Sequence, residues 1–207
     1  MLNWALLTAF IPTFFFVSIT PGMCMTLSMS LGMTVGVRRA LWMMCGELLG
    51  VGLVATSAVL GIATVMLRYP SAFLVGKVVG GIYLMYLGYC LWRSKGKLAL
   101  SDTESLSQTM SRRELAWQGF VTAIANPKGW AFFIALLPPF ISPEHTMVTQ
   151  LPLLVALILL LEFTCLIIYA SGGKSLSMLL KNRSNVKVIN RLAGTLMVGV
   201  GIWLMLT

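Results

Sequence analysis

Two acidic residues lie deep inside apolar stretches of this sequence. Glu47 is surrounded by Gly46, leucines and a second glycine, and Glu162 follows three leucines. An ionised carboxylate at the centre of a bilayer costs from about 3 to above 10 kcal/mol. Each glutamate should therefore be protonated, paired or lining a wet cavity. Either could bind a substrate ammonium or carry a coupling proton, the alternative being a structural pair with Lys128 or Lys77.

Two proline motifs, Pro21-Gly22 and Asn126-Pro127-Lys128, interrupt apolar stretches. A proline inside a helix removes a hydrogen bond, and a carbonyl freed in lipid costs several kcal/mol unless protein or water satisfies it. Both motifs should therefore face the interior, unless they are simple structural kinks. Each break exposes the N-terminus of a half-helix, where free N–H groups favour an anion such as a substrate carboxylate.

Lys128 follows the second break and could meet a substrate carboxylate directly, or it could extend to the membrane interface. These motifs predict a substrate-binding set and a proton-coupling set. The first comprises Pro21, Gly22, Glu47, Asn126, Pro127 and Lys128, and the second comprises Glu47 and Glu162.

Sulfur-bearing residues after the first break suggest a different chemistry. Met25, Met29 and Met33 recur every four residues, so they share a helix face, and with Met23 and Cys24 they could bind a soft ion such as Cu(I). Packing is the simpler interpretation. The single histidine, His145, lies among prolines, which excludes a histidine metal site or proton relay. We therefore expect no resident metal and no cofactor, and we find no Ser/His or Cys/His set, HExxH or CxxC typical of an enzyme.

The composition shows what kind of element must position these residues. Of 207 residues, 58% are hydrophobic and 10% are charged, and the mean hydropathy is +0.90, whereas soluble domains are about 25% charged. One spanning helix takes roughly 20 apolar residues, so we predict an all-α protein of six transmembrane helices. They cover about 2–27, 40–67, 72–92, 115–137, 147–170 and 188–206.

The net charge of +9 does not indicate a nucleic-acid partner, because the basic residues lie in short loops between apolar stretches. There they set topology and meet anionic lipid head groups. Twelve lysines and arginines fall on one side of the six-helix arrangement and two on the other, with Lys128 set aside. The positive-inside rule then places both termini outside the cytoplasm.

The two halves of the chain share a pattern. A phenylalanine precedes the interrupting proline by seven residues in each half, a glutamate occupies each second span, and a basic residue precedes a glycine by three at each third span. Three spans per half is an odd number, so the second half is inverted relative to the first, as in many secondary transporters. We predict one transporter domain over 1–207, with a first repeat at about 1–93, a loop at 94–113 and a second repeat at about 114–207.

Several motifs together resemble the LysE/RhtB family of amino-acid exporters, over nearly the whole chain. The similar residues are Thr20-Pro21-Gly22-Met23, Gly32, Gly36, Arg38-Arg39, Gly46, Gly50, Gly61, Gly80, Tyr83, Leu84, Leu87, Gly88, Gly119, Asn126-Pro127-Lys128, Phe132, Phe133, Pro138 and Phe140. The resemblance implies efflux of amino acids or close relatives across the bacterial inner membrane, driven by the proton gradient. The family usually has Pro-Gly-Pro at the first break, and Met23 replaces the second proline here, so that the break is less rigid.

The leading hypothesis is a proton-coupled amino-acid exporter (an antiporter) whose partners are its substrate and the lipid bilayer, with a homo-oligomer left as an open alternative. The substrate carboxylate would lie near Gly22 and Lys128 and its ammonium near Glu47. The alternatives are a cadmium or copper exporter that uses the sulfur cluster, as the wider superfamily implies, and a membrane scaffold that transports nothing.

Overall fold

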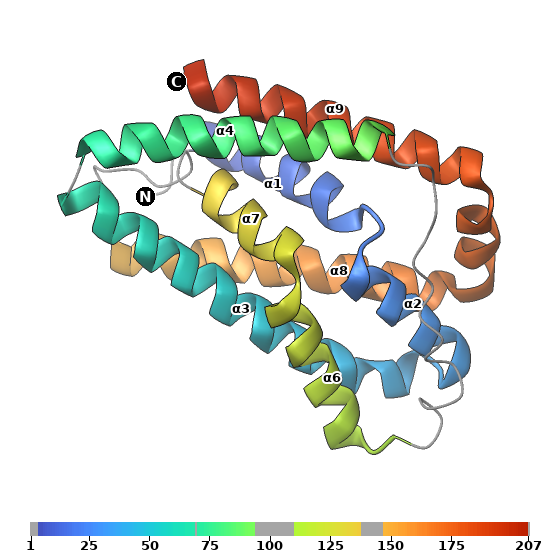
Figure 1. The fold of residues 1–207 in the computed structure, drawn as a ribbon. Coiled ribbons are helices and arrows are strands. Elements are labelled where there is room, and N and C mark those ends of the chain that lie inside the picture. The colour runs from blue at the N-terminus through green and yellow to red at the C-terminus, as the bar shows by residue number, and fades with distance from the viewer. Residues whose placement is uncertain (1–3, 69, 94–109, 138–146, 207) are drawn as a thin grey trace.

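The computed structural model describes residues 4–68, 70–93, 110–137 and 147–206, and every regular element in these ranges is a helix (Figure 1). The all-α prediction is therefore confirmed for the described residues. The helices are α1 (Trp4–Ile19), α2 (Met23–Thr34), α3 (Val37–Arg68), α4 (Pro70–Arg93), α6 (Arg112–Ala125), α7 (Pro127–Leu136), α8 (Met147–Lys181) and α9 (Arg183–Leu206).

The chain breaks at both predicted positions. Helices α1 and α2 meet at an angle of 60°, with Pro21 and Gly22 between them outside either helix. Helices α6 and α7 are separated by Asn126 alone, whose backbone is extended at φ −76° and ψ 103°. Pro127 is the first residue of α7, where its missing N–H needs no intrahelical partner. Pro21 therefore lies between two half-helices, and Pro127 starts the second half-helix of its pair.

Membrane-spanning capacity is clearest in the two longest helices. Val37–Gly61 in α3 and Thr149–Gly173 in α8 are long and apolar enough to cross a bilayer, and the bent α1–α2 pair would make a third span among the described residues. The chain is therefore a multi-pass membrane protein, while the number six stays a prediction. Most of the predicted loop at 94–113 lies outside the described residues. His145 and the side chain of Lys77 also lie outside them.

Helix α8 changes direction at Gly173, three residues after the predicted end of the fifth span. Gly173 has φ 35° and ψ −115°, a backbone conformation that favours glycine. The helix nevertheless continues to Lys181, and α9 begins at Arg183, five residues before the predicted start of the sixth span. The expected loop after span 5 is thus mostly helical.

Glycines allow two helix pairs to approach closely. A Cβ added to Gly46 on α3 would lie 1.8 Å from the carbonyl oxygen of Ala116 on α6, and one added to Gly119 on α6 would lie 2.0 Å from that of Met43 on α3. Close backbone contact of this kind is typical of membrane helices. It holds the start of the second half against the N-terminal half of α3, beside Glu47.

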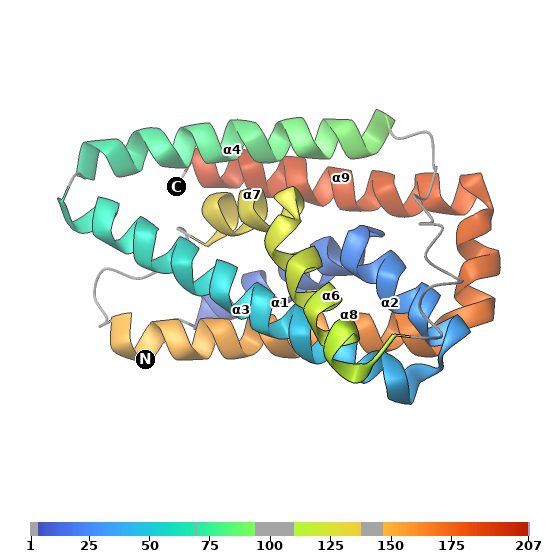
Figure 2. The same ribbon diagram turned by 60° about the horizontal axis from the view of Figure 1, so that its bottom comes forward.

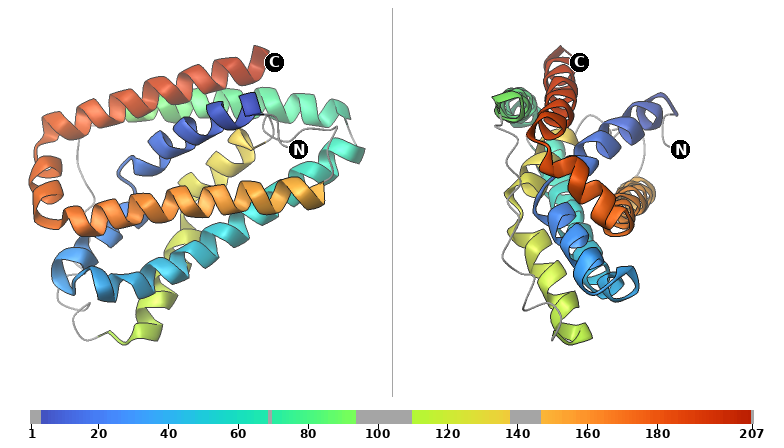
Figure 3. Two further views of the ribbon diagram at one scale, coloured as in Figure 1. Left: turned by 180° about the vertical axis from the view of Figure 1, so that it is seen from behind. Right: turned by 90° about the vertical axis from the view of Figure 1, so that its right-hand side faces the viewer.

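Helices α4 and α9 lie side by side and antiparallel along one edge of the molecule (Figures 1 and 2). A Cβ on Gly81 would meet the carbonyl oxygen of Gly201, and one on Gly88 would meet that of Gly194. Both chain ends and the α3–α4 turn lie at one end of the bundle, and the α2–α3 and α8–α9 turns lie at the other, as Figure 3 also shows.

Candidate functional site

A cavity of about 60 Å³ lies where the two helix breaks meet. At about 10–15 Å³ for each water-sized occupant, it has room for roughly four to six waters. Its lining joins two apolar clusters of the core. The lining residues are Phe14, Val17, Ser18, Thr20, Gly22, Cys24, Met25, Glu47, Val51, Val54, Ala123, Asn126, Lys128, Gly129, Phe132, Phe133 and Glu162.

Glu47 reaches this cavity from the N-terminal half of α3 and is fully buried. Among the described residues, neither of its carboxyl oxygens has a hydrogen-bond partner. Glu162 and Cys24 lie close enough to interact with it electrostatically. A buried polar group without a partner costs free energy, so the carboxyl group of Glu47 is the part of the cavity best suited to receive a hydrogen-bonding guest.

Glu162 reaches the same cavity from α8. Its Oε2 accepts a hydrogen bond from the Ser18 hydroxyl of α1. Its charge interacts with that of Lys128 and with that of Glu47. The tertiary structure therefore brings together the two glutamates that the sequence places 115 positions apart. One of them has a hydrogen-bond donor and the other does not.

Lys128 donates hydrogen bonds to the C-terminal end of α1, at the first break. Its Nζ donates to the carbonyl oxygens of Val17 at 2.8 Å and Thr20 at 3.2 Å. The last carbonyls of a helix lack partners and carry the negative end of the dipole, so an ammonium is well placed there. In this structure Lys128 does not extend to the membrane interface. It contacts the site as a helix cap, and its Nζ would be 3.8 Å from a Cβ on Gly22.

Other carbonyls at the end of α1 also have donors from side chains. The Tyr169 hydroxyl of α8 donates to the carbonyl oxygen of Ile19 at 2.7 Å, and the Thr20 hydroxyl donates to that of Phe16 at 2.8 Å. A helix break inside a bilayer requires a hydrogen-bond donor for each carbonyl group that the break frees. The first break is therefore stabilised largely by residues of the second half of the chain.

The N-termini of the two half-helices that follow the breaks differ. Asn126 caps α7 itself, because its Oδ1 accepts from the backbone N–H of Lys128 at 3.1 Å, and the N–H of Gly129 donates to the Asn126 carbonyl, also at 3.1 Å. Gly22 occupies the equivalent position before α2 and has no side chain that could cap it. Of the two breaks, the first therefore has the N-terminus more available to an anion.

Six of the seven predicted site residues can be compared with the cavity directly. Gly22, Glu47, Asn126, Lys128 and Glu162 line it, whereas Pro21 does not. The side chain of Pro127 lies outside the described residues. The prolines thus create the breaks, while the residues around them form the cavity wall.

Sequence reasoning missed the aromatic side of the cavity and the hydroxyl groups of α1. Phe14 of α1 packs against Phe132 and Phe133 of α7, with ring centroids 5.4 and 6.1 Å apart. Ser18 and Thr20 lie just before the first break. Phe132 and Phe133 were among the residues that resemble the exporter family, and this was the one signal for an aromatic wall of the cavity. Nothing in the sequence indicated that they contact Phe14.

The sulfur cluster does not converge on the cavity as a unit. Cys24 and Met25 line it, and Cys24 Sγ accepts from Asn126 Nδ2 at 3.6 Å. Met29 is fully buried in a neighbouring apolar cluster. The described residues contain no group of three or more His, Cys, Asp or Glu side chains that could hold a metal ion.

Known proteins similar to this chain include exporters of small molecules. The homoserine/homoserine lactone efflux protein of Salmonella typhimurium is 28% identical over 193 residues, which cover 93% of this chain and 92% of the relative. The leucine efflux protein of the same organism is 26% identical over 170 residues, covering 79% and 77%. The membrane protein YrhP of Bacillus subtilis is 27% identical over 205 residues, covering 95% and 96%.

No solved structure matches the chain. Residues 14–207 match the family model of the LysE type translocators, which are transporters and not enzymes. That match includes both helix breaks, both glutamates of the cavity and the whole cavity lining, so this chain belongs to the LysE type translocator family.

Proposed function

We propose that this protein exports an amino acid or a close derivative across the bacterial inner membrane in exchange for protons. The observation that carries the proposal is Glu47, a fully buried carboxyl group with no hydrogen-bond partner among the described residues, in a cavity at the meeting point of two broken helices. Substrate sites of secondary transporters are commonly found at such breaks. Efflux relatives of similar length support the substrate class.

The substrate ammonium binds Glu47, which has oxygen acceptors to offer. The substrate carboxylate binds the uncapped first turn of α2 after Gly22, with the positive charge of Lys128 nearby. Asn126, at the second break, lines the polar end of the cavity, and Pro21 and Pro127 keep both breaks open. The apolar side chain of the substrate lies against Phe14, Phe132 and Phe133.

A proton and a substrate ammonium compete for the same pair of carboxyl groups. Glu47 and Glu162 interact electrostatically, and two ionised carboxylates this close in an apolar setting repel each other. A proton that enters from outside neutralises a carboxylate and releases the ammonium there. This competition couples export of one ligand to import of the other.

Access alternates when one three-helix repeat moves against the other. The close antiparallel contact of α4 with α9, at Gly81 and Gly201 and at Gly88 and Gly194, joins the last helix of one repeat to the last helix of the other. Six spans with both termini outside, as the basic loops predict, complete the arrangement. A cavity of about 60 Å³ has to widen before it holds a whole amino acid.

Counterflow in liposomes tests the proposal. Purified protein is reconstituted with internal unlabelled homoserine or leucine, and uptake of the labelled compound is followed. Glu47→Gln is expected to reduce counterflow to the level of empty liposomes, because an amide cannot hold the ammonium by charge. Glu114→Gln, an exposed glutamate at the start of α6, is the matched control and retains counterflow. Unchanged counterflow in Glu47→Gln would remove this residue from the mechanism.

An imposed pH gradient tests the coupling separately. The wild type is expected to accumulate substrate against its gradient when the trans side is acidic, and Glu162→Gln to lose most of this accumulation. Accumulation that is independent of the pH gradient would contradict proton exchange while leaving the substrate site intact.

A further inference from the structure

A second hollow, of about 700 Å³, lies at the end of the bundle opposite the chain termini and apart from the cavity described above. The α2–α3 turn and the start of α6 form it. Its lining residues are Val35, Arg38, Arg39, Trp42, Ser111 and Arg112. Three of the six are arginines, so the chemistry of this hollow is that of an anion site.

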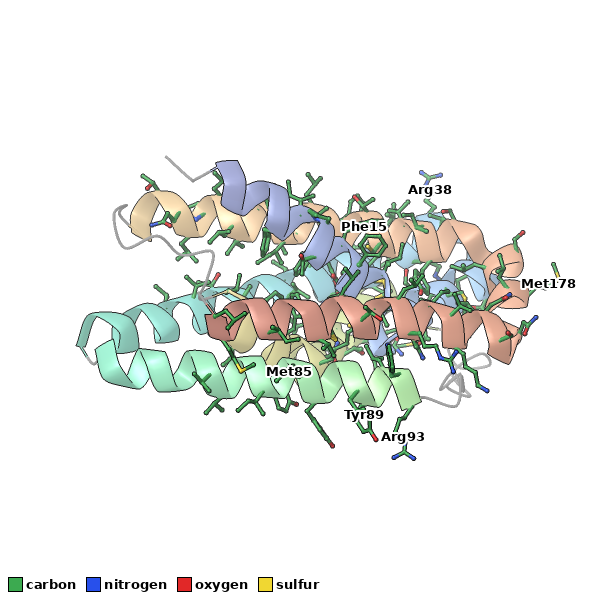
Figure 4. The ribbon with its side chains drawn as sticks, turned by 90° about the horizontal axis from the view of Figure 1, so that it is seen from above. Phe15, Arg38, Met85, Tyr89, Arg93 and Met178 are labelled. Atoms are coloured by element: carbon green, nitrogen blue, oxygen red, sulfur yellow. The ribbon has the colours of Figure 1, made fainter. Side chains whose placement is uncertain are left out.

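The three arginines are held differently. Arg38 is exposed and its guanidinium extends away from the helices (Figure 4). Arg39 Nη2 donates to the carbonyl oxygen of Met110 at 2.5 Å, which joins the two sides of the hollow. The guanidinium of Arg112 lies over the Trp42 ring, 5.5 Å from its centroid. Arg39 and Arg112 are thus held by contacts across the hollow, while the exposed side chain of Arg38 can move toward a ligand.

Within the part of the chain that the structure describes, no acidic residue lines the hollow. The closest described acidic residue in sequence, Glu114, accepts from the backbone N–H of Ser111 at 2.5 Å. That hydrogen bond lowers the pKa of Glu114, which therefore stays ionised at the start of its own helix. Helices α3 and α6 both begin here, and each adds the positive end of its dipole.

We propose that this hollow binds the phosphate-bearing head group of an anionic phospholipid. Arginine matches phosphate geometry through paired N–H groups. A lipid source is favoured over a soluble one because the α3 segment able to cross the bilayer begins at Val37, beside the hollow. Trp42, which is 44% exposed, is a residue type that concentrates at the membrane interface. This site is independent of substrate export.

The test measures binding of a defined lipid to the purified full-length protein. Phosphatidylglycerol or phosphatidylcholine is titrated into the protein in detergent, and binding is followed by native mass spectrometry and by the midpoint of thermal unfolding. Phosphatidylglycerol is expected to bind and stabilise the wild type, and phosphatidylcholine to do so far less. Each basic residue near a charged membrane surface contributes enough to change affinity by about fivefold.

Arg38→Gln is the first variant, because its exposed side chain can be replaced without disturbing the fold. It should weaken phosphatidylglycerol binding by about fivefold, and Arg38→Gln/Arg112→Gln by about 25-fold. Arg93→Gln is the control, since this arginine also lies at a helix end but contacts Tyr89 on α4. Unchanged lipid binding in Arg38→Gln and in the double variant would overturn the proposal. Equal stabilisation of the wild type by inorganic phosphate would replace the lipid by a soluble anion and also overturn it.

Discussion

The two helix breaks show how similar motifs can be stabilised in different ways. The second break is local, because Asn126 ends α6, caps α7 and contributes to the cavity wall. The first break depends on distant residues, since Lys128 and Tyr169 satisfy the carbonyls at the end of α1. Gly22 leaves the next helix without a side-chain cap. The break that relies on the other half of the chain is therefore the one with an N-terminus available to a ligand.

Removing the ammonium of Lys128 should lower stability and transport more than any other change at the two helix breaks. Lys128→Met removes the side-chain donor from the carbonyls of Val17 and Thr20 in an apolar setting and leaves that of Val17 with only the N–H of Thr20, at 3.3 Å. We expect a loss of about 3 kcal/mol in stability. Transport should be lost as well, because the first break no longer keeps its shape. The thermal midpoint in detergent and counterflow in liposomes measure the two effects.

Arg113→Met, a change at an exposed residue, is the control for Lys128→Met and should alter stability by no more than about 0.5 kcal/mol. A Lys128→Met protein as stable as the wild type would show that the carbonyls at the end of α1 do not need a distant donor.

Removing the local cap should have a smaller effect. Asn126→Ala deletes the hydrogen bond to the N–H of Lys128, and caps of this kind are worth about 1 kcal/mol. The thermal midpoint should fall by roughly 2–4 °C for a protein of this size. A fall as large as that of Lys128→Met would contradict the view that the second break is the self-contained one.

Adding a cap where none exists should affect stability least and transport selectively. Gly22 has extended backbone at φ −143°, and a Cβ there would have only ordinary contacts, the nearest at 3.8 Å. Gly22→Ser should change stability by a few tenths of a kcal/mol. Its hydroxyl would occupy N–H groups of α2 that the substrate carboxylate needs, and the KM for counterflow should rise about tenfold.

Gly22→Ala is the matched control for that experiment, because it adds the same Cβ without a hydroxyl acceptor. Its KM should stay close to that of the wild type. Equal KM values for the serine and alanine variants would place the substrate carboxylate elsewhere in the cavity.

Much of the site could be predicted from the sequence because charged residues and prolines are costly inside a bilayer, so each of them indicates a partner, a cavity or a helix break. A glutamate within an apolar stretch needs a partner or a cavity, and Glu47 and Glu162 both reach one. The roles of Lys128 and Asn126 were less predictable. A lysine after a break can face a ligand, a carbonyl or the interface, and only contacts with α1 decide among them.

Some features have no signal in a single sequence. The aromatic wall pairs Phe14 with Phe132 and Phe133 across more than one hundred positions, and apolar side chains pack without a motif. The continuation of α8 past Gly173 was missed because two adjacent glycines usually end a helix, whereas here the helix turns and resumes.

The sequence by itself determined that this protein lies in a membrane, that its helices break at Pro21 and Pro127, and that two carboxyl groups lie within apolar stretches. These properties follow from local composition and from the missing hydrogen bond of proline. Only the tertiary structure decided that Lys128 caps α1, that Ser18 bonds Glu162 while Glu47 lacks a donor, and that both breaks share one cavity. Those outcomes depend on which helices pack together, and long-range packing cannot be inferred from residue types alone.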